Sequence, residues 1–331
     1  MHIAIIILNW NGRKLLQECL PHVISHSKLS NAKHSYRIWI ADNASTDDSI
    51  PFVQAEFEQE VSILQLDKNY GFAEGYNRAI AEIECDIAIL LNSDAYPLSP
   101  WLDPLIERFD LDPKLGALMP KIKDAKNPQA FEYAGAAGGF VDVLGFPYCS
   151  GRARSSVAMD TGQYNTAIPV LWASGAAMLV RKSVFLECGG LDADFFAHME
   201  EIDLCWRIWR NGYTIICEPQ SEIYHIGGAS LNASNPRKTY YNFRNNLALI
   251  WKHWTTTELI CKLLPRLIID GLIGIIWLLQ GKGAHTWAIV KGHNHFFRSI
   301  RLWQSKRKQL NHLSKQLPDG LIQGSVFTAK A

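Results

Sequence analysis

Residues 86–94 have the sequence DIAILLNSD, an apolar strand that runs without interruption into Asn92 and Asp94. Strand and helix patterns alternate before it, with strands predicted at residues 3–8, 36–41 and 61–66 and helices at residues 13–25, 48–59 and 73–83. Strands that are apolar along their whole length and alternate with helices are typical of a parallel sheet covered on both faces. We therefore expect an α/β fold with a mostly parallel central sheet flanked by helices.

Polar residues follow the predicted strands at their C-terminal ends. Asn9, Asp42, Asn69 and Asp94 each come just after such a strand. In open α/β sheets, ligands bind at the carboxyl ends of the strands. The four polar turns are therefore expected to converge on one crevice.

Asp94 is a candidate metal ligand because a carboxylate at the end of a buried strand can bind a hard cation such as Mg²⁺ or Mn²⁺. The alternative, an aspartate that caps the next turn, is about equally favoured for a lone Asp. His225 ends another predicted strand at residues 222–225. A buried core histidine is the ordinary interpretation there. His225 can serve as a ligand only if its strand ends near Asp94.

Residues 195–207, FFAHMEEIDLCWR, place Glu200, Glu201 and Asp203 in the first turn of a helix predicted at residues 200–211. Acids at a helix N-terminus favour the helix dipole, and Asp203 is spaced to pair with Arg207, so a purely structural role is one interpretation. The other is a general base, a carboxylate that takes a proton from a reacting group such as a hydroxyl. The helix N-terminus is expected to keep that carboxylate ionised.

Composition excludes some classes of protein. The net charge of +1 over 331 residues argues against general nucleic-acid binding. The seven cysteines are scattered, without Cys-x-x-Cys spacing, which favours reduced thiols in the cytoplasm. The first strand is followed by Asn-Trp-Asn-Gly rather than Gly-x-Gly-x-x-Gly, which argues against a nicotinamide-dependent oxidoreductase. Residues 121–166 have weak periodicity and are expected to form loops and short strands over the edge of the sheet.

Six motifs in a fixed order resemble glycosyltransferase family 2, and within it the bacterial rhamnosyltransferase-like branch that builds surface polysaccharides. They are residues 7–12 (ILNWNG), 42–47 (DNASTD), 69–73 (NYGFA), 91–94 (LNSD), 173–176 (ASGA) and 189–192 (GGLD), the last running into residues 200–204 (EEIDL). The resemblance covers about residues 3–249. It implies a nucleotide-diphosphate-sugar fold of the GT-A type and an inverting, single-displacement transfer.

The resemblance also implies roles for individual residues. Asp42 would hydrogen-bond a pyrimidine base, and Asp94 and His225 would hold Mg²⁺ or Mn²⁺. Glu201, or alternatively Glu200, would be the base. Arg244 would touch the diphosphate or else cap a packed helix. The other residues expected around the nucleotide sugar are Asn9, Asn11, Asn69, Gly71, Asn92, Ser174, Gly175 and Asp203.

Two positions depart from the family pattern. Asn92 stands where the family has a metal-site Asp, and Glu201 stands where the second acid is usually Asp. These departures motivate an alternative function, a catalytically impaired donor-binding relative that acts as a scaffold in polysaccharide assembly. The expected donor is a dTDP-linked rhamnose, with a UDP-linked hexose as the second choice, and the expected acceptor is a hydroxyl of a lipid-linked or polysaccharide glycan.

The C-terminal region differs in charge from the rest of the chain. We expect a catalytic domain at residues 1–249 and an amphipathic, basic helical region at residues 250–331. Residues 258–279 are apolar, but Arg266 and Asp270 among others make them marginal for a membrane span. Residues 271–318 contain eight Lys or Arg and no Asp or Glu, which favours peripheral binding to an anionic membrane at the cytoplasmic face of the plasma membrane. A packed helical appendage or a contact between copies of the chain is the alternative.

Overall fold

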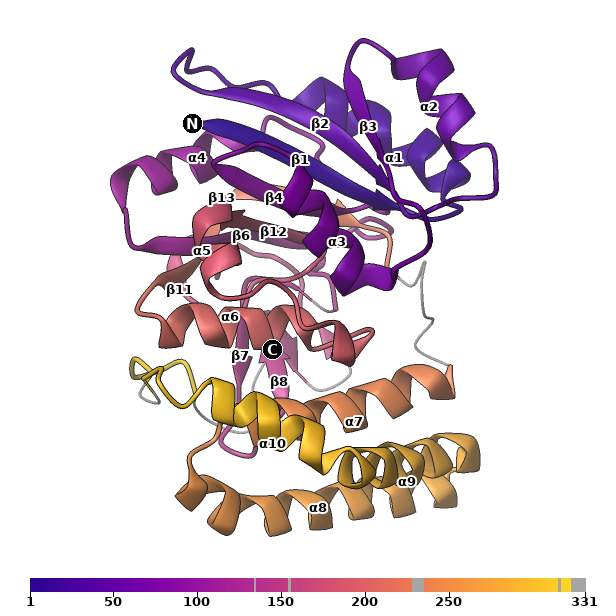
Figure 1. Ribbon diagram of the computed structural model, residues 1–331, viewed down its shortest axis with the longest axis vertical. Helices are drawn as coiled ribbons and strands as arrows, with labels where there is room; N and C mark the ends of the chain where they lie inside the picture. The colour runs from indigo at the N-terminus through magenta and orange to yellow at the C-terminus, as the bar shows by residue number, and fades with distance from the viewer. Residues whose placement is uncertain (134, 154–155, 228–234, 315–316, 323–331) are drawn as a thin grey trace.

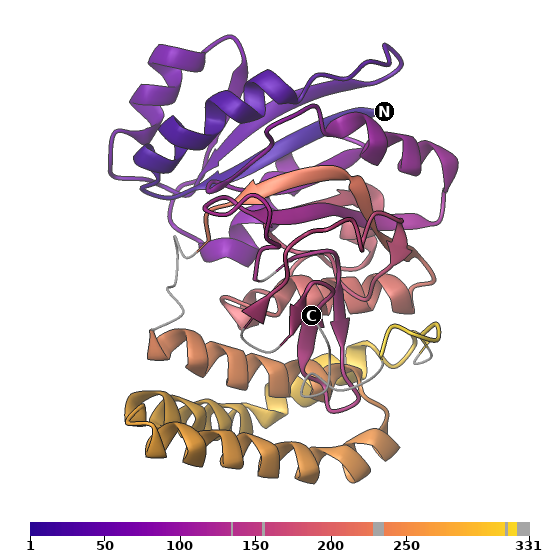
Figure 2. The same cartoon turned by 180° about the vertical axis from the view of Figure 1, so that it is seen from behind.

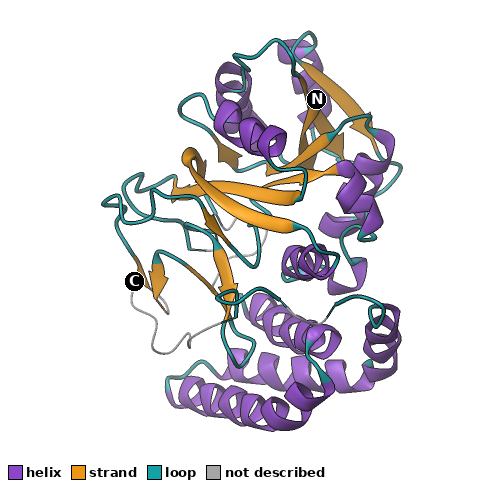
Figure 3. Ribbon diagram, turned by 90° about the vertical axis from the view of Figure 1, so that its left-hand side faces the viewer, coloured by secondary structure: helices purple, strands orange, loops and turns teal. Residues whose placement is uncertain are grey.

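The computed structural model of this chain describes residues 1–133, 135–153, 156–227, 235–314 and 317–322. The central sheet and its flanking helices form the upper and middle parts of the molecule (Figure 1). A layer of four helices lies below them, formed by α7 (Pro236–His253), α8 (Thr256–Leu279), α9 (Gly283–Arg298) and α10 (Ile300–Gln309). The same division is visible when the molecule is turned by 90° (Figure 3).

The central sheet has nine strands among the described residues. Their bounds are β1 (His2–Asn9), β2 (Ser35–Asp42), β3 (Val61–Gln65), β4 (Ile87–Asn92), β5 (Ala95–Tyr96), β6 (Leu115–Asp124), β11 (Ile168–Pro169), β12 (Ala177–Arg181) and β13 (Thr214–His225). The order is β11-β13-β6-β12-β4-β1-β2-β3, and β5 pairs with β13. Two further pairs are formed by β7 (Gly139–Val141) with β8 (Pro147–Cys149) and by β9 (Arg152–Ala153) with β10 (Ser156–Val157).

Four of the eight strand pairings in the central sheet are parallel and four are antiparallel. β1 is parallel to β2 and β4, β2 to β3, and β13 to β6, whereas β12 is antiparallel to both β4 and β6, and β13 is antiparallel to β11 and β5. The apolar runs are continuous because these strands are covered on both faces, and residues 87–91 of β4 are all buried. The α/β fold with a central sheet flanked by helices is therefore confirmed.

The helices above the lower layer are α1 (Arg13–His26), α2 (Ser49–Phe57), α3 (Gly71–Glu82), α4 (Leu102–Leu111), α5 (Lys182–Glu187) and α6 (Glu200–Arg210), with a 3₁₀ helix η1 (Ala193–Phe195). The helices predicted at residues 13–25, 48–59, 73–83 and 200–211 are present with small shifts at their ends. Sequence patterns did not predict α4 or the long strand β6. The strand predicted at residues 222–225 is the end of a longer strand, β13, whose register is irregular between Glu218 and Glu222.

The lower helical layer is fixed to the upper part through α8. Arg266 donates from Nε to Asp270 Oδ1 at 3.0 Å, and both side chains are buried. The same guanidinium stacks 3.6 Å from the ring centroid of Phe146 and donates to the carbonyl of Leu144, next to the β7–β8 hairpin. Seen from behind, the hairpin reaches down to the helical layer (Figure 2). The predicted C-terminal helical appendage is confirmed, and none of the helices in the described part of the chain has the length and hydrophobicity to cross a bilayer.

Candidate active site

The ends of β1 and β2 meet in a polar cluster. Strand register places Asn9 beside Asp42, and Asn9 Nδ2 donates to Asp42 Oδ1 at 3.0 Å. Ser45 donates to the same carboxylate from its hydroxyl, at 2.5 Å to Oδ1, and from its backbone N–H, at 3.0 Å to Oδ2. Because a carboxylate has about four lone-pair sites, these three bonds orient Asp42 and leave acceptor capacity on Oδ2. Ser45 lies within one of the motifs, but its part in orienting Asp42 was not predicted.

Two other predicted residues hold turns in the same region. Asn11 has a positive φ of 51° and accepts a hydrogen bond at Oδ1 from the backbone N–H of Thr46 at 2.7 Å, which ties the loop after β1 to the loop after β2. Asn69 Oδ1 accepts from the backbone N–H of Gly71 at 2.8 Å. Gly71 has a φ of 74° at the start of α3, a conformation that glycine adopts without strain. Both asparagines therefore shape the walls of the predicted crevice.

A second cluster lies at the ends of β4 and β13. His225 Nε2 is 3.1 Å from Asp94 Oδ1, and all these polar atoms lie in largely buried side chains. Glu132 Oε1 lies 3.6 Å from the other ring nitrogen, Nδ1, which is too far for a hydrogen bond but close for opposite charges. Burial alone would lower the pKa of His225, but Asp94 and Glu132 outweigh it and raise the pKa to about 10. The condition set for His225 as a ligand, a strand end beside Asp94, is met.

The donor set fits a cation shared with a substrate better than an all-protein metal cage. Among the described residues, no group of three or more His, Cys, Asp or Glu side chains is arranged to hold a metal. The reason is visible in the geometry, because the two ring nitrogens of His225 face different carboxylates, Asp94 and Glu132. His225 must lose its proton before it can bind a cation. Asp94 and His225 can then supply two ligands on one side, and Mg²⁺-type cations commonly take the remaining ones from phosphates and water.

A loop of small residues connects this second cluster to helix α6. The backbone N–H of Asn92 donates to the carbonyl of Ala176 at 3.0 Å, so the loop leaves the sheet beside the end of β4. A Cβ added at Gly175 would lie 3.5 Å from Phe72 Cζ and 3.8 Å from Glu201 Cβ. Ser174, next to it, is buried. Gly175 thus lies between the strand end that carries Asp94 and the first turn of α6.

The acids of α6 face the same region. Burial is the main cause that raises the pKa of the Cys149 thiol to about 12, and the carboxylates of Glu132 and Glu201 both add to it. Glu132, which lies beside His225, and Glu201, which lies beside Gly175, therefore both raise the pKa of one residue, Cys149. This supports a site shared by the metal-site side chains and the acidic helix, which stays a prediction.

The protonation of the two glutamates differs from the prediction. Backbone N–H groups at the start of α6 lower the pKa of Glu201, as expected of a helix N-terminus, but burial is the larger effect and the net shift is upward. The pKa of Glu200 is raised well above its ordinary value by burial and then by the charge of Glu201. The Oε2 atoms of both residues are buried and have no hydrogen-bond partner. A raised pKa makes a carboxylate a stronger base once it is ionised.

Asp203, a predicted nucleotide-sugar residue, has a structural position. Its carboxylate is fully buried and already has three protein partners, the cations Lys252 (Nζ at 2.6 Å) and Arg207 (Nη2 at 2.8 Å) and the imidazole of His253 (Nε2 at 2.9 Å). The Asp203–Arg207 pair considered from the sequence is present, and α7 supplies the other two partners. Asp203 joins α6 to α7.

Arg244 also has a structural position. Its guanidinium donates to the carbonyls of Asp194 at 2.7 Å and Phe195 at 2.8 Å and is buried there. Its neighbour Asn245 donates to three carbonyls of the same loop, those of Phe195, Ala197 and His198. The loop leads into α6 and contains three non-glycine residues with positive φ, namely Phe196, His198 and Met199. α7 therefore holds a strained loop directly before the acidic turn.

Several curated proteins are similar in sequence. The N-acetylglucosaminyl-diphospho-decaprenol L-rhamnosyltransferase of Mycobacterium tuberculosis is 29% identical over 206 residues, which cover 57% of this chain and 66% of that protein. The pre-mycofactocin glycosyltransferase of the same species is 26% identical over 265 residues, 77% of this chain and 50% of that one. The chain thus matches two thirds or less of the length of these relatives.

Solved structures show the same fold at low sequence identity. The structure of GalNAc-T7 with UDP, GalNAc and Mn²⁺ has a TM-score of 0.60 at 15% identity and covers 77% of this chain and 48% of that one. The mannosyltransferase PcManGT from Pyrobaculum calidifontis, in complex with GDP-Man and Mn²⁺, has a TM-score of 0.51 at 12% identity and covers 93% and 84%. The GT-A type fold is confirmed. A family model described as glycosyl transferase family 2 matches residues 4–189, more than half of the sequence, and the chain therefore belongs to glycosyl transferase family 2.

Proposed function

We propose that this glycosyltransferase transfers a sugar from a nucleotide-diphosphate donor to a hydroxyl acceptor with inversion at the anomeric carbon. The observation that carries the proposal is the position of Gly175. It lies against Glu201 on one side, and on the other its loop is hydrogen-bonded to the strand end that leads to Asp94. A glycine there lets a sugar diphosphate approach the backbone between a cation site and a base.

The donor would lie along the carboxyl edge of the sheet. Asp42, oriented by Asn9 and Ser45, would accept a hydrogen bond from the pyrimidine base at Oδ2. Asp94 and His225 would hold a divalent cation, Mg²⁺ or Mn²⁺, which when bound would neutralise charge on the diphosphate as the glycosidic bond breaks. The two structural relatives crystallised with Mn²⁺ support this choice of cofactor.

Glu201 would act on the acceptor. Its ionised carboxylate takes the proton of the acceptor hydroxyl while that oxygen bonds to the anomeric carbon from the face opposite the diphosphate. The bond from the anomeric carbon to the diphosphate oxygen breaks in the same step and its electron pair leaves with the diphosphate, so the configuration inverts. Burial without a hydrogen bond to Oε2 leaves that oxygen available for the incoming proton. Glu200 is the alternative base.

The substrates and location are proposed from the relatives and from the charge of the chain. A dTDP-linked rhamnose is the first candidate donor and a UDP-linked hexose the second. A lipid-linked glycan is the candidate acceptor because the name of one relative specifies transfer to a decaprenol-diphosphate-linked sugar. We further propose that residues 1–249 carry the transfer site, that residues 250–331 associate with membrane, and that the enzyme works at the cytoplasmic face of the plasma membrane.

Nucleotide release with a panel of nucleotide sugars, with and without Mn²⁺, tests the proposal. We expect Mn²⁺-dependent release with at least one dTDP- or UDP-linked sugar, and a loss of about 10²–10⁴-fold in Glu201→Gln. Glu84→Gln is the matched control, because Glu84 is an exposed glutamate away from the site. Full turnover by Glu201→Gln would assign the base elsewhere. Donor binding without any release or transfer would favour the scaffold function suggested by Asn92 and Glu201.

A further inference from the structure

Helix α8 has large apolar side chains on its exposed face and buried charged side chains on its inner face. This is the opposite of a helix on the surface of a water-soluble protein. Eight large apolar side chains of this helix are each between 52% and 82% exposed, and we call six of them the apolar stripe: Ile260, Leu264, Ile268, Leu272, Ile276 and Leu279. They follow one another at intervals of four, four, four, four and three residues, which places them on one face of the helix. The stripe spans about 29 Å at 1.5 Å per residue. An exposed apolar surface of this length marks an interaction site.

The charged side chains in the middle of α8 point inward and fix this orientation. Asp270 is fully buried and pairs with Arg266 from α8 and, through Oδ2, with His293 Nε2 of α9 at 3.1 Å. Arg266 also donates to the side-chain oxygen of Asn246 on α7. Turning α8 to bury the stripe would separate the Arg266–Asp270 pair from Asn246 and His293 and expose it, at an energetic cost. The apolar face is therefore held outward by the packing of the helical layer.

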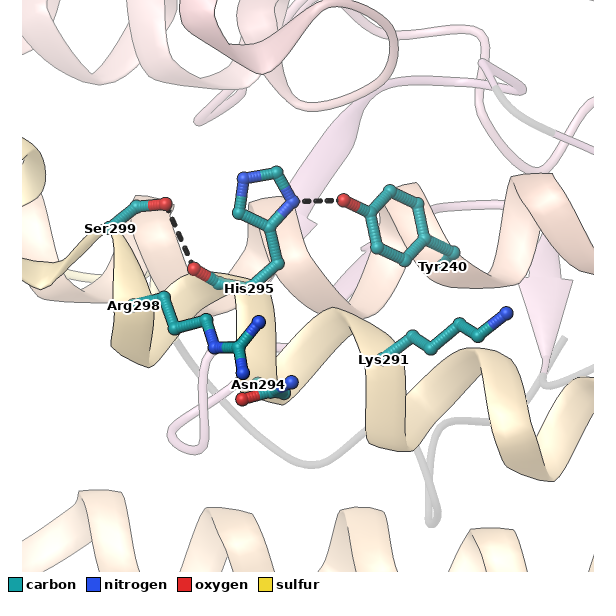
Figure 4. Close-up of a pocket in the computed structure, with 6 residues that line it drawn as sticks. All are labelled: Tyr240, Lys291, Asn294, His295, Arg298 and Ser299. Atoms are coloured by element: carbon teal, nitrogen blue, oxygen red, sulfur yellow. Dashed lines mark hydrogen bonds between the residues drawn. The ribbon is translucent and has the colours of Figure 1, made fainter.

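A basic groove lies on the same helical layer, between α7 and α9 (Figure 4). It has a volume of about 480 Å³ and is lined by Tyr240, Lys291, Asn294, His295, Arg298 and Ser299. The lining side chains are hydrogen-bond donors or cations, and none is acidic. A second hollow of about 330 Å³ shares Tyr240 and Lys291 and extends the groove to Arg237 and the exposed Trp287. A groove lined by cations and hydrogen-bond donors suits a phosphate group.

We propose that the apolar stripe lies in the interface of an anionic phospholipid bilayer and that the groove binds the phosphate of a lipid headgroup. The choice of occupant follows from charge, since residues 271–318 contain no acid and present five exposed cations, which attract an anionic surface: Lys282, Lys291, Arg298, Arg301 and Lys308. Trp287 and the stripe supply the aromatic and apolar contacts of a helix that lies in the membrane plane. This inference rests on the proposed function in that it names the surface that brings the enzyme to a lipid-linked acceptor.

Vesicle flotation tests the stripe without any sugar transfer, so a negative result here leaves the transfer reaction open. The wild-type chain is expected to float with vesicles of phosphatidylcholine and phosphatidylglycerol. The triple variant Leu264→Gln, Ile268→Gln, Leu272→Gln should bind at least about 100-fold more weakly, because three inserted side chains are lost. The matched control changes three exposed leucines on the upper part of the molecule to Gln: Leu98, Leu111 and Leu186. The control should bind like the wild type.

A second pair of variants tests the groove. Lys291→Gln with Arg298→Gln should weaken binding to phosphatidylglycerol vesicles by about 25-fold, about fivefold for each cation near the surface. Binding to pure phosphatidylcholine vesicles should change little. Lys114→Gln with Lys126→Gln removes the same charge from exposed positions outside the helical layer and should have no effect on either vesicle.

Three outcomes would overturn the inference. One is unchanged flotation of the stripe variant at unchanged thermal stability. Another is a wild-type chain that ignores vesicles but forms dimers in sedimentation experiments that the stripe variant does not form, because the stripe would then join two copies of the chain. The third is a groove that binds free inorganic phosphate in the absence of any vesicle binding.

Discussion

Replacement of Asp203 by Asn keeps the shape of the side chain but removes an anion from a fully buried cluster. Asp203 Oδ1 contacts Lys252 and His253 of α7, and Oδ2 contacts Arg207 one turn along α6. Burial and the nearby cations lower the pKa of His253 to about 4, so it is neutral at pH 7 and donates its Nε2–H. The two remaining partners are cations, and both would stay buried without their anion.

The size of the effect follows from the remaining partners of these cations. Breaking a buried ion pair by removing one member costs about 3–5 kcal/mol. Lys252 keeps Asp192 at 2.7 Å, and Arg207 keeps the carbonyls of Cys188 and Gly190. We therefore expect the free energy of unfolding of Asp203→Asn to fall by about 3 kcal/mol, near the lower limit of that range. At about 2–4 °C per kcal/mol for chains of 150–250 residues, the melting temperature should fall by roughly 6–12 °C.

Differential scanning calorimetry of the wild type, Asp203→Asn and a surface control measures this loss. Asp48→Asn is the control, because the Asp48–Arg13 pair is 3.6 Å long and its carboxylate is 73% exposed, so its loss should cost at most about 1 kcal/mol. Donor affinity, measured well below the melting temperature, should stay within about twofold of the wild type. An Asp203→Asn protein with normal melting temperature but weakened donor binding would restore Asp203 to the nucleotide-sugar site and refute the structural assignment.

The pH dependence of this loss has a defined sign. Although burial opposes it, the cations Lys252 and Arg207 hold the pKa of Asp203 well below its ordinary value. A group with a lowered pKa stabilises the folded state above its unfolded pKa, and this contribution is lost as the pH falls through the folded pKa. The difference between wild type and Asp203→Asn should therefore be constant from about pH 5 to pH 8 and shrink only below about pH 4.

Three further predictions concern the site. Because burial and Glu201 raise the pKa of Glu200, stability is lost as the pH rises through that pKa, so Glu200→Gln should melt higher than the wild type at pH 8 but not at pH 4 in thermal scans. Asp94→Ala should slow nucleotide release by at least about 100-fold and weaken Mn²⁺ binding in calorimetry, while circular dichroism stays unchanged. Gly175→Ala should fold within about 1 kcal/mol of the wild type because its Cβ has room, whereas Gly175→Leu should raise the donor KM at least about tenfold.

The parallel half of the fold was predictable because its strands are apolar along their whole length and its turns are polar. Asn9 and Asp42 could be placed together since parallel strands end at one edge, and their hydrogen bond follows from that register. The antiparallel strand β12 could not be predicted from such a pattern. It is only five residues long, and its pairing with β4 and β6 is a long-range contact without a local signal.

The sequence did not predict those parts of the site in which a side chain is buried against residues from distant segments. Nothing in the weakly periodic stretch around Glu132 indicates that its carboxylate lies beside His225. Asp203 and Arg244 were assigned to ligand binding because of their residue types and positions in motifs. Their partners, Lys252 on α7 and the carbonyl of Phe195, come from distant segments, and only the packed structure shows that both side chains are already satisfied.

The position of helix α7 determines where this chain can be joined to a related enzyme in a hybrid protein. A junction after residue 249, between the two proposed regions, falls inside α7. The donor-binding strands would then be severed from Lys252 and His253, which belong to the scaffold of the acidic helix. Swapping the C-terminal module with that of a related enzyme should therefore use a splice at residues 254–255, where α7 has ended and α8 has not begun.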